Sequence, residues 1–415
     1  MTVDLGSQIA EHLLPSPPPA IGIAVSGGGD SMALLHLLYD FARDHPVQLH
    51  AVTVDHGLRP DAGAEAAAVA ARCAELGIPH QTRRWTGWDH QGNLQKAARD
   101  ARYALITDWA QDNRLQTVAL GHTLDDQAET LLMRLARGAG VDGLTGMSPR
   151  RLSLGITWLR PLLGASRADL RADLTARGVA WIEDPSNEDL RFDRVRMRKA
   201  LDLLSPLGID AHALGQVASN MARARDALSW QAFLEARRIA RSEAGAVCLD
   251  WRVYRTLPDE TARRILLSAL GWISGSDYVP RRRPVLGLIE LLKAGTGGTV
   301  DGCHAWRNHD MLWVAREYQG VRDVTCSTTE LWDGRWRVEG GPEHANLHVA
   351  ALGTAGLAQL PAWRKTGRPG EVLRVTPGVW RGPELVAAPA AGLENGWRAQ
   401  VEGGDDALFA ALLSH

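Results

Sequence analysis

Three consecutive glycines between a serine and an aspartate are the most informative residues of the sequence. Residues 21–31 are Ile-Gly-Ile-Ala-Val-Ser-Gly-Gly-Gly-Asp-Ser, an apolar run typical of a β-strand, and an apolar segment with helical spacing follows. Glycine permits a tight turn and a close approach to a ligand, and hydroxyl groups and helix N-terminal N–H groups bind anions. The residues predicted to bind phosphate are Ser26, Gly27, Gly28, Gly29, Asp30 and Ser31.

This glycine pattern differs from the two commonest nucleotide-binding loops. No Lys-Ser or Lys-Thr pair follows the glycines, as a Walker loop requires, and no glycine lies three residues after Gly29, as a dinucleotide-binding loop requires. The hexapeptide Ser-Gly-Gly-x-Asp-Ser instead resembles the PP-loop of the ATP pyrophosphatase superfamily. That loop holds the pyrophosphate that leaves when a substrate oxygen is adenylated. An ordinary glycine-rich turn between a strand and a helix is the alternative interpretation.

The segments around the loop predict the fold that positions it. Apolar β-type runs alternate with helical segments, which is typical of βαβ units and a parallel sheet in an α/β domain. In such sheets ligands bind beyond the carboxyl ends of the strands. The clusters 26–31, 55–59 and 122–126, each at a strand end, are therefore expected to meet at one cleft. The strands are expected at 21–25, 48–54, 79–84 and 116–120, and the helices at 32–38, 64–76, 93–109 and 126–137.

A second glycine pattern has a different meaning. Residues 138–143 spell G-x-G-x-x-G, but they follow the helical segment 127–137 rather than a strand. Without that strand the motif is a weak sign of nucleotide binding. We interpret these residues as a helix C-cap and a loop.

The chain is long enough for two or three domains, because single cores usually stop growing near ~250–300 residues. We predict a PP-loop ATP-binding catalytic domain at 1–205. A helical domain is expected at 206–295, since residues 211–294 have a mainly helical pattern. A small β-rich or α+β domain is expected at 296–415, with short strands at 299–401 and a terminal helix near 406–413.

Composition narrows the class of protein. Hydrophobic residues make up 45% and charged residues 23%, as in ordinary soluble proteins. The N-terminus lacks the pattern of a signal peptide, and no apolar run reaches the ~20 residues of a membrane span, so we expect a cytoplasmic protein with no membrane partner. The four cysteines form no Cys-x-x-Cys pair and are expected to be free thiols.

Charge alone does not indicate a nucleic-acid partner, because the formal net charge is −2. Of the 46 basic residues, however, only four are lysine and 42 are arginine. Arginine suits bidentate contact with phosphate. A GC-rich genome would give the same bias, so the arginine content leaves both explanations open.

Seven blocks, in their order along residues 20–205, resemble the tRNA(Ile)-lysidine synthetase family of bacteria. The first two are the loop 26–31 and Val54-Asp55-His56-Gly57-Leu58-Arg59. The others are Asn93-Leu94-Gln95 with Ala98-Arg99 and Arg102-Tyr103, residues 121–130, residues 134–140, Arg160-Pro161-Leu162 and Glu183-Asp184-Pro185-Ser186-Asn187. The sequence departs from the family pattern at Val195, where Asn is usual, and in a short C-terminal part, which leaves the mode of tRNA binding open.

The resemblance implies a ligase that attaches lysine to the wobble cytidine of tRNA(Ile) with a CAU anticodon. This modification changes decoding from AUG to AUA and identity from methionine to isoleucine. The cytosine C2 oxygen attacks the α-phosphorus of ATP and expels pyrophosphate, and the lysine ε-amine then displaces AMP at C2. The implied reactants and cofactors are tRNA(Ile), free L-lysine, ATP and Mg²⁺. A homodimer stays open, because the sequence does not give the oligomeric state.

For the adenylation step the resemblance assigns roles at three strand ends. The loop 26–31 would hold the β- and γ-phosphates, and Asp30 would bind Mg²⁺, cap the following helix, or do both. ATP binding extends to Asp55 and His56. His122 and Arg102 are expected to stabilise the charge that develops at the α-phosphorus.

The lysine step requires an uncharged amine, whereas the lysine side chain has a pKa of about 10.4. Asp126 and Glu129 lie three residues apart and share one face of a helix, so one of them is expected to bind the ammonium group and accept its proton. The sequence leaves open which one is the base. Asp125 points to another side and is assigned to Mg²⁺. Favourable charges in the first turn of a helix are the alternative explanation of these carboxylates.

The resemblance also implies tRNA binding by the helical domain 206–295 and tRNA recognition by the domain 296–415. The basic segment 191–199 is predicted to contact tRNA phosphates. Arg194, Arg196 and Arg198 are the candidates, and one of them would reach the α-phosphate. Because residues two apart do not share a helix face, one or two of the three are expected to lie on a solvated face.

Two other classes of protein compete with this interpretation. Other adenylating PP-loop enzymes are the nearest, but the related thiolases use Cys-x-x-Cys motifs that are absent here, and NAD or GMP synthetases lack this combination of blocks. A catalytically silent RNA-binding protein is the second alternative. The presence of Asp30, Asp126 and Glu129 argues against it.

Overall fold

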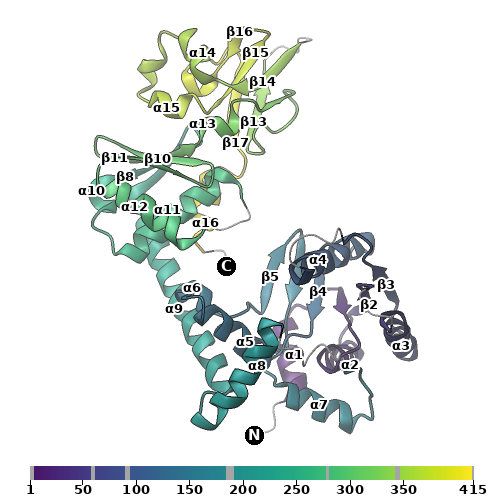
Figure 1. Cartoon of the computed structure of the whole chain (residues 1–415). Helices are drawn as coiled ribbons and strands as arrows, with labels where there is room; N and C mark the ends of the chain where they lie inside the picture. The colour runs from purple at the N-terminus through teal and green to yellow at the C-terminus, as the bar shows by residue number, and fades with distance from the viewer. Residues whose placement is uncertain are drawn as a thin grey trace. The chain divides into compact units, whose positions relative to one another are not determined.

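The computed structural model describes residues 4–57, 61–88, 94–183, 191–276, 280–341 and 346–413. The chain forms two compact units, Met1–Arg225 and Asp226–Ser414. Figure 1 shows the elements of each unit. No helix in the described part of the chain is long and apolar enough to cross a membrane.

A six-stranded sheet in the order β3-β2-β1-β4-β6-β5 forms the centre of the first unit. All neighbours are parallel except β5, which pairs antiparallel with β6. The three predicted strand-end clusters follow β2, β1 and β4, which are neighbours, so the expected parallel α/β fold is confirmed. The strands are β1 (Ala20–Ala24), β2 (Gln48–Asp55), β3 (His80–Arg84), β4 (Thr117–Leu120), β5 (Arg150–Ser153) and β6 (Ile156–Leu159).

Helices cover both faces of this sheet (Figure 1). One apolar cluster joins the sheet to α1, α2, α3 and α7, and another joins it to α4, where Trp109 packs against the strands. Gly22 of β1 permits that packing, because a Cβ there would lie 2.8 Å from the Trp109 ring. The helices are α1 (Leu5–Leu13), which the sequence analysis did not predict, α2 (Gly29–Asp44), α3 (Ala62–Glu75), α4 (Leu94–Asp112), α5 (Leu124–Leu135), α6 (Val141–Leu144), α7 (Arg167–Ala176) and α8 (Asp193–Leu204).

The residues 138–143 form a helix end and a loop, as predicted. Helix α5 ends at Leu135, and Gly138 then adopts a positive φ of 66°, a conformation that glycine tolerates. The one-turn helix α6 follows. This glycine pattern therefore has a structural explanation, and it does not follow a strand.

The second unit contains helices and antiparallel sheets. One sheet has the order β7-β8-β11-β10-β9 and shares a core with α11 and α12, and a second has the order β12-β14-β15-β16. A third, two-stranded sheet pairs β13 with β17. The strands are β7 (Ala240–Glu243), β8 (Ala246–Asp250), β9 (Gly298–Val300), β10 (Cys303–Asn308), β11 (Met311–Arg316), β12 (Thr325–Cys326), β13 (Trp336–Gly340), β14 (Leu347–Ala351), β15 (Pro377–Arg381), β16 (Glu384–Ala387) and β17 (Trp397–Val401).

The helices of this part begin with the long α9, which starts in the first unit. They are α9 (Ala211–Ile239), α10 (Trp251–Tyr254), α11 (Asp259–Ser274), α12 (Arg282–Lys293), α13 (Tyr318–Val321), α14 (Gly353–Ala358), α15 (Gly370–Leu373) and α16 (Gly404–Ala410). Strands β7 and β8 interrupt the region that the sequence analysis treated as mainly helical. Their alternation was missed because β8 is buried on both faces and lacks a polar side.

The two units differ from the three predicted domains in where the chain divides. The predicted boundary after residue 295 falls between α12 and β9, which belong to one hydrophobic core. The roles assigned to 1–205, 206–295 and 296–415 stay predictions.

Candidate active site

The phosphate loop lies between β1 and α2 and is held by its own serine. The backbone N–H of Ser26 donates to Ser31 Oγ at 3.1 Å, and Ser31 Oγ donates to the carbonyl of Gly28 at 2.9 Å. Gly27 has a φ of +85°, and a Cβ there would lie 2.7 Å from Cδ1 of Ile182. The glycine is therefore required both by its conformation and by its neighbour.

A close backbone approach joins the loop to the end of β4. A Cβ at Gly121 would lie 2.9 Å from the carbonyl oxygen of Asp30, so only glycine fits at this position. Because Gly121 directly precedes His122 and helix α5, the first turns of α2 and α5 lie side by side. This contact brings the carboxylates of the two helices to one place.

Helix α5 begins with a capping box that includes one of the predicted catalytic carboxylates. The hydroxyl of Thr123 accepts from the N–H of Asp126, and Asp126 Oδ2 accepts from the N–H of Thr123 at 2.9 Å. One turn further, the side chain of Glu129 is only 1% exposed. Both carboxylates face the same side of α5, as their spacing predicted.

Arg167 connects these carboxylates to each other. Its Nη2 donates to Asp126 Oδ1 at 2.7 Å and its Nη1 to Glu129 Oε1 at 2.8 Å. Its Nε lies 3.4 Å from Asp30 Oδ2, and its backbone N–H donates to Asp125 Oδ2 at 2.8 Å. Four of the five predicted acidic residues therefore meet at a single arginine, and Asp55 is the exception.

The sequence analysis gave Arg167 no role, although the chain carries a signal for it. Arg167 is the first residue of α7 and follows the N-cap Ser166. A cation in the first turn opposes the helix dipole, which favours anions there. An arginine at that place therefore indicates an acidic partner from another element.

The charges in this cluster shift the pKa values of its members. Burial raises the pKa of the Asp30 carboxyl, and the charge of Asp126 adds to this effect while Arg167 opposes it. Burial would also raise the pKa of Asp126, but Arg167 and Arg194 outweigh it, so the pKa of this carboxyl lies below its ordinary value. Asp126 is therefore held as a carboxylate, whereas the pKa of the Asp30 carboxyl lies above its ordinary value chiefly because that group is buried.

The three predicted arginines of α8 lie on two sides of the helix. Arg198 donates from Nε to Glu129 Oε1 at 3.0 Å, and Nε of Arg194 lies 3.8 Å from Glu129 Oε2. Arg196 instead pairs with Asp193 on its own helix. The structure thus brings Arg194 and Arg198 to the acidic cluster and places Arg196 elsewhere, as the spacing predicted for residues two apart.

His122 lies between the acidic cluster and a group of arginines. It is buried, and its Nδ1 has no hydrogen-bond partner among the described residues. Burial lowers the pKa of His122 to about 3, and the charges of Arg160, Arg102 and Arg194 act in the same direction. His122 is therefore neutral at ordinary pH, and its ring can donate one hydrogen bond without adding charge.

Tyr103 marks the same positive region. Burial alone would raise the pKa of its phenol, but Arg99, Arg102 and Arg160 outweigh burial and lower it. The ring packs edge-on against Trp158 with centroids 4.7 Å apart, and a close approach of Arg160 to its hydroxyl also lowers the pKa of the phenol. A group of arginines suits an anion such as phosphate.

Asp55 and His56 lie at the end of β2, the neighbour of β1. Asp55 Oδ1 accepts from the N–H of Gly57 at 2.8 Å, so this carboxylate already holds the turn. His56 packs edge-on against Trp85 with ring centroids 5.9 Å apart. Burial lowers the pKa of His56, and Arg102 adds to this effect. Other parts of the predicted blocks, namely Leu58, Arg59, Asn93 and 184–187, lie outside the described residues.

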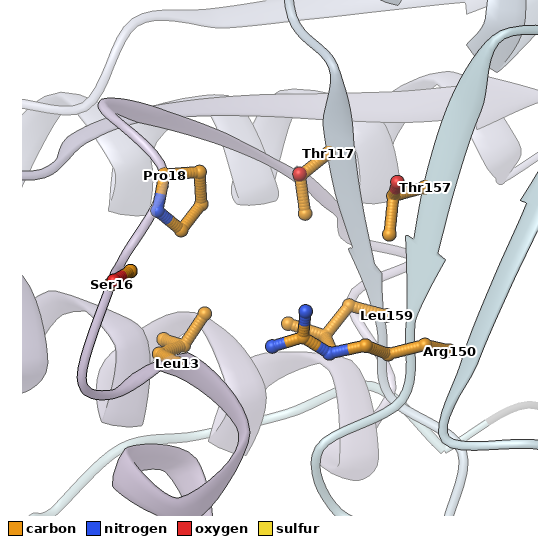
Figure 2. Close-up of a pocket in the computed structure, with 7 residues that line it drawn as sticks. All are labelled: Leu13, Ser16, Pro18, Thr117, Arg150, Thr157 and Leu159. Carbon is orange, nitrogen blue, oxygen red and sulfur yellow. The ribbon is translucent and has the colours of Figure 1, made fainter.

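A pocket at the opposite edge of the sheet contains none of these groups (Figure 2). Its volume is about 150 Å³. Thr117 begins β4, so the pocket lies at the amino ends of the strands, and Nη2 of Arg150 is already bonded to the carbonyl of His12. The predicted strand-end clusters instead follow the carboxyl ends of β1, β2 and β4. The pocket is lined by Leu13, Ser16, Pro18, Thr117, Arg150, Thr157 and Leu159.

Comparison with known proteins identifies the family. Residues 1–203 match the family model of the PP-loop domain. The chain is 52% identical over 412 residues to a tRNA(Ile)-lysidine synthase from Ruegeria pomeroyi, with 99% of this chain and 98% of the relative covered. A tRNA(Ile)-lysidine synthase from Methylobacterium nodulans is 41% identical over 282 residues, which cover 67% of this chain and 82% of the relative.

Among solved structures, the chain is similar to the U34-tRNA thiolase NcsA from Methanococcus maripaludis. That comparison has 16% identity and a TM-score of 0.46, and it covers 52% of this chain and 78% of that one. The relative from Ruegeria pomeroyi is matched along almost its whole length, and the phosphate loop, the carboxylates and the arginines occupy one edge of the sheet. The chain therefore belongs to the tRNA(Ile)-lysidine synthase family.

Proposed function

We propose that this protein uses ATP to join lysine to C2 of the wobble cytidine of tRNA(Ile) with a CAU anticodon. The observation that carries the proposal is the pair Asp126 and Glu129, which lies beside the phosphate loop and within a ring of arginines. The names of the relatives support tRNA(Ile) as the substrate. The product is lysidine, and AMP and pyrophosphate are released.

Adenylation is assigned to the loop and the arginines. The loop 26–31 and the first N–H groups of α2 would bind the β- and γ-phosphates. Arg102 and the neutral His122 would donate hydrogen bonds to the α-phosphate as the C2 oxygen attacks. Asp55 and His56, at the end of the next strand, would border the rest of ATP. In this step a bond forms between the C2 oxygen and the α-phosphorus. The bond from the α-phosphorus to the oxygen that bridges to the β-phosphate breaks, and pyrophosphate leaves with its electrons.

The lysine step is assigned to the carboxylates of α5. Glu129 Oε2 is buried and has no hydrogen-bond partner among the described residues, whereas both oxygens of Asp126 are occupied. This difference favours Glu129 as the group that accepts a proton from the lysine ammonium. The amine then attacks C2, and the C2–O bond to AMP breaks. Asp126 would contribute its charge to the binding of lysine.

Mg²⁺ fits the surroundings of Asp30. Its carboxylate is 28% exposed, is bound to Arg167 only at 3.4 Å and lies at the phosphate loop. Among the residues that the structure describes, no group of three or more ligating side chains is preformed for a metal. This agrees with Mg²⁺, which commonly takes one or two carboxylates together with substrate phosphates and water. Bound there, the ion would neutralise phosphate charge. Asp125 would be the second carboxylate that holds it.

Recognition of the tRNA is assigned to α8 and the C-terminal parts. Arg194 and Arg198 face the site, so they would contact the phosphates near the target base, which must be turned out of its loop. Arg196 would act from the other side of α8. The division of tRNA contacts among 206–295 and 296–415, the homodimer and the cytoplasmic location stay predictions.

Transfer of labelled lysine to tRNA(Ile) bearing CAU, with ATP and Mg²⁺, tests the proposed function. Elongator methionine tRNA, which has the same anticodon, is the control, and release of AMP is followed in parallel. Label in the isoleucine tRNA alone is the expected result. AMP release without label would contradict lysine as the nucleophile, and the absence of both signals would contradict adenylation.

A further inference from the structure

Arg167 binds the carboxylate of Glu129 in an asymmetric way. Its Nη1 donates to Oε1, and Nε of Arg198 donates to the same oxygen at 3.0 Å. Oε2 accepts no hydrogen bond among the described residues, although Nε of Arg194 lies 3.8 Å from it, and the side chain is only 1% exposed. A buried carboxylate oxygen without a partner is costly and therefore calls for a ligand. Two arginines thus fix the carboxylate in the orientation that leaves Oε2 for that ligand.

Asp126 is fixed by the same arginine from the opposite side. Its Oδ2 accepts from the N–H and the hydroxyl of Thr123, and its Oδ1 accepts from Arg167 Nη2 at 2.7 Å. The guanidinium is planar and rigid, so a group that bonds to Asp126 and Glu129 together sets the distance between them.

Arg167 is itself held at its backbone. Its N–H donates to Asp125 Oδ2 at 2.8 Å, and the N–H of Leu124 donates to the carbonyl of Ala165 at 2.9 Å. These bonds tie the start of α7 to the start of α5. The guanidinium therefore extends from a fixed point toward the two carboxylates, and its position does not depend on its side chain alone.

The bond from Arg167 to Asp30 is different. At 3.4 Å it is longer than the other two, and Asp30 is the more exposed carboxylate. Asp30 can therefore turn toward the phosphates without loss of a strong bond. The contacts of Arg167 are concentrated on the carboxylates assigned to the lysine step.

We propose that Arg167 is a positioning residue for the lysine step: it orients Glu129 so that Oε2 faces the incoming amine, and adenylation does not require it. This inference rests on the proposed function. It predicts that loss of the guanidinium separates the two steps of the reaction.

The test measures each step in a single turnover with the full-length protein. Adenylation is followed as pyrophosphate release from ATP with tRNA(Ile) in the absence of lysine. Lysine transfer is followed when lysine is added to the preformed adenylated tRNA over a range of concentrations. In Arg167→Gln the maximal transfer rate is expected to fall about 100-fold, as expected for reacting groups displaced by about 1 Å. The half-saturating lysine concentration rises, and adenylation keeps its rate.

Two further variants separate positioning from packing. Arg171→Gln lies one turn along the same helix, where Arg171 pairs with Glu183 at the surface, and it is expected to leave both steps unchanged. In Arg167→Ala, added methylguanidinium is expected to restore part of the transfer rate. Arg167→Lys keeps a cation but cannot bridge two carboxylates, so it is expected to transfer lysine slowly even where the Gln and Ala variants fail to fold.

Three outcomes would overturn the inference. Equal loss of adenylation and transfer in Arg167→Gln or Arg167→Lys would assign Arg167 to the site as a whole, and unchanged transfer would leave it as a packing residue. If methylguanidinium does not restore the transfer rate of Arg167→Ala, Arg167 would likewise be a packing residue. If the wild-type protein forms adenylated tRNA but no lysidine, the proposed function fails instead, so the two failures are distinguishable.

Discussion

The helices α5 and α7 begin with the same local motif and yet differ in what they do. In α5 the N-cap Thr123 and Asp126 bond to each other reciprocally, and in α7 Ser166 and Asp169 do the same. The two helix starts are neighbours. Asp126 is nevertheless part of the acidic cluster, whereas Asp169 bonds only to Ser166 within the described residues.

The surroundings of the two capping boxes, Thr123 with Asp126 and Ser166 with Asp169, explain this difference. Asp126 is buried and bound by Arg167, while Asp169 is half-buried and forms no ion pair with any residue that the structure describes. His122 directly precedes the first box, and Ala165 directly precedes the second. The same local hydrogen bonds therefore cap a helix in one place and, in the other, also hold a buried carboxylate that is paired with Arg167. Burial and partners from distant parts of the chain decide between the two roles.

Substitution of the two aspartates is expected to have the largest effect on this comparison. Asp126→Asn keeps an oxygen for Thr123 but removes the charge that Arg167 binds, so lysine transfer is expected to fall about 10²-fold, the effect of misplacing reacting groups by about 1 Å. Asp169→Asn keeps its cap in the same way and removes no charge from the cluster. Its lysine transfer is expected to equal that of the wild type.

Label incorporation into tRNA(Ile) at saturating ATP measures both variants side by side. Thermal unfolding serves as the control for folding, because each variant retains its cap. If Asp126→Asn and Asp169→Asn lose lysine transfer equally, the two capping boxes do not differ in function.

The sequence predicted the carboxylates of α5 and the phosphate loop, but it did not predict which arginines bind these carboxylates. The loop 26–31, Asp126 and Glu129 are close in sequence to strand ends, so topology alone places them together. Arg167 was missed because its partners lie 38 to 137 residues away along the chain. The spacing on α8 predicted that its three arginines do not share one face, but only packing against α5 shows that Arg194 and Arg198 lie on the face of the site.

The second unit was less predictable for a related reason. Its core joins α11 and α12 to strands on both sides of them in sequence. Strand β8 has four buried residues in a row, so it has no polar alternation to distinguish it from a helical segment. The alternation of polar and apolar residues cannot identify a strand that is buried on both faces.

His122, the residue before the first capping box, gives a prediction of intermediate size for how stability depends on pH. Burial lowers the pKa of His122 to about 3, whereas an unfolded histidine has a pKa of about 6.5. Between these values the unfolded chain binds a proton that the folded chain excludes, so acid favours unfolding. From pH 7 to pH 5 this group is expected to remove about 2 kcal/mol of stability, at 1.36 kcal/mol for each pKa unit.

His122→Asn should remove that part of the pH dependence, since asparagine does not titrate. Urea unfolding of the wild type and the variant at both pH values measures the difference. An identical pH dependence in the two proteins would mean that the imidazole of His122 titrates normally in the folded state. The start of α5, which His122 precedes, would then differ less from the start of α7, which is preceded by Ala165, a residue that cannot titrate.

The smallest expected effect concerns the caps themselves. Thr123→Ala and Ser166→Ala each remove the hydroxyl that accepts from the third N–H of its helix, at 3.4 and 3.1 Å respectively. Each is expected to cost about 1 kcal/mol of unfolding free energy, the usual effect of losing an N-cap side chain. Urea denaturation at neutral pH measures both, and a difference of several kcal/mol between them would contradict the equivalence of the boxes. If the two costs agree while only Asp126→Asn abolishes lysine transfer, the helix-capping role and the chemical role of the first box are separate properties, and only the second depends on Arg167 and its neighbours.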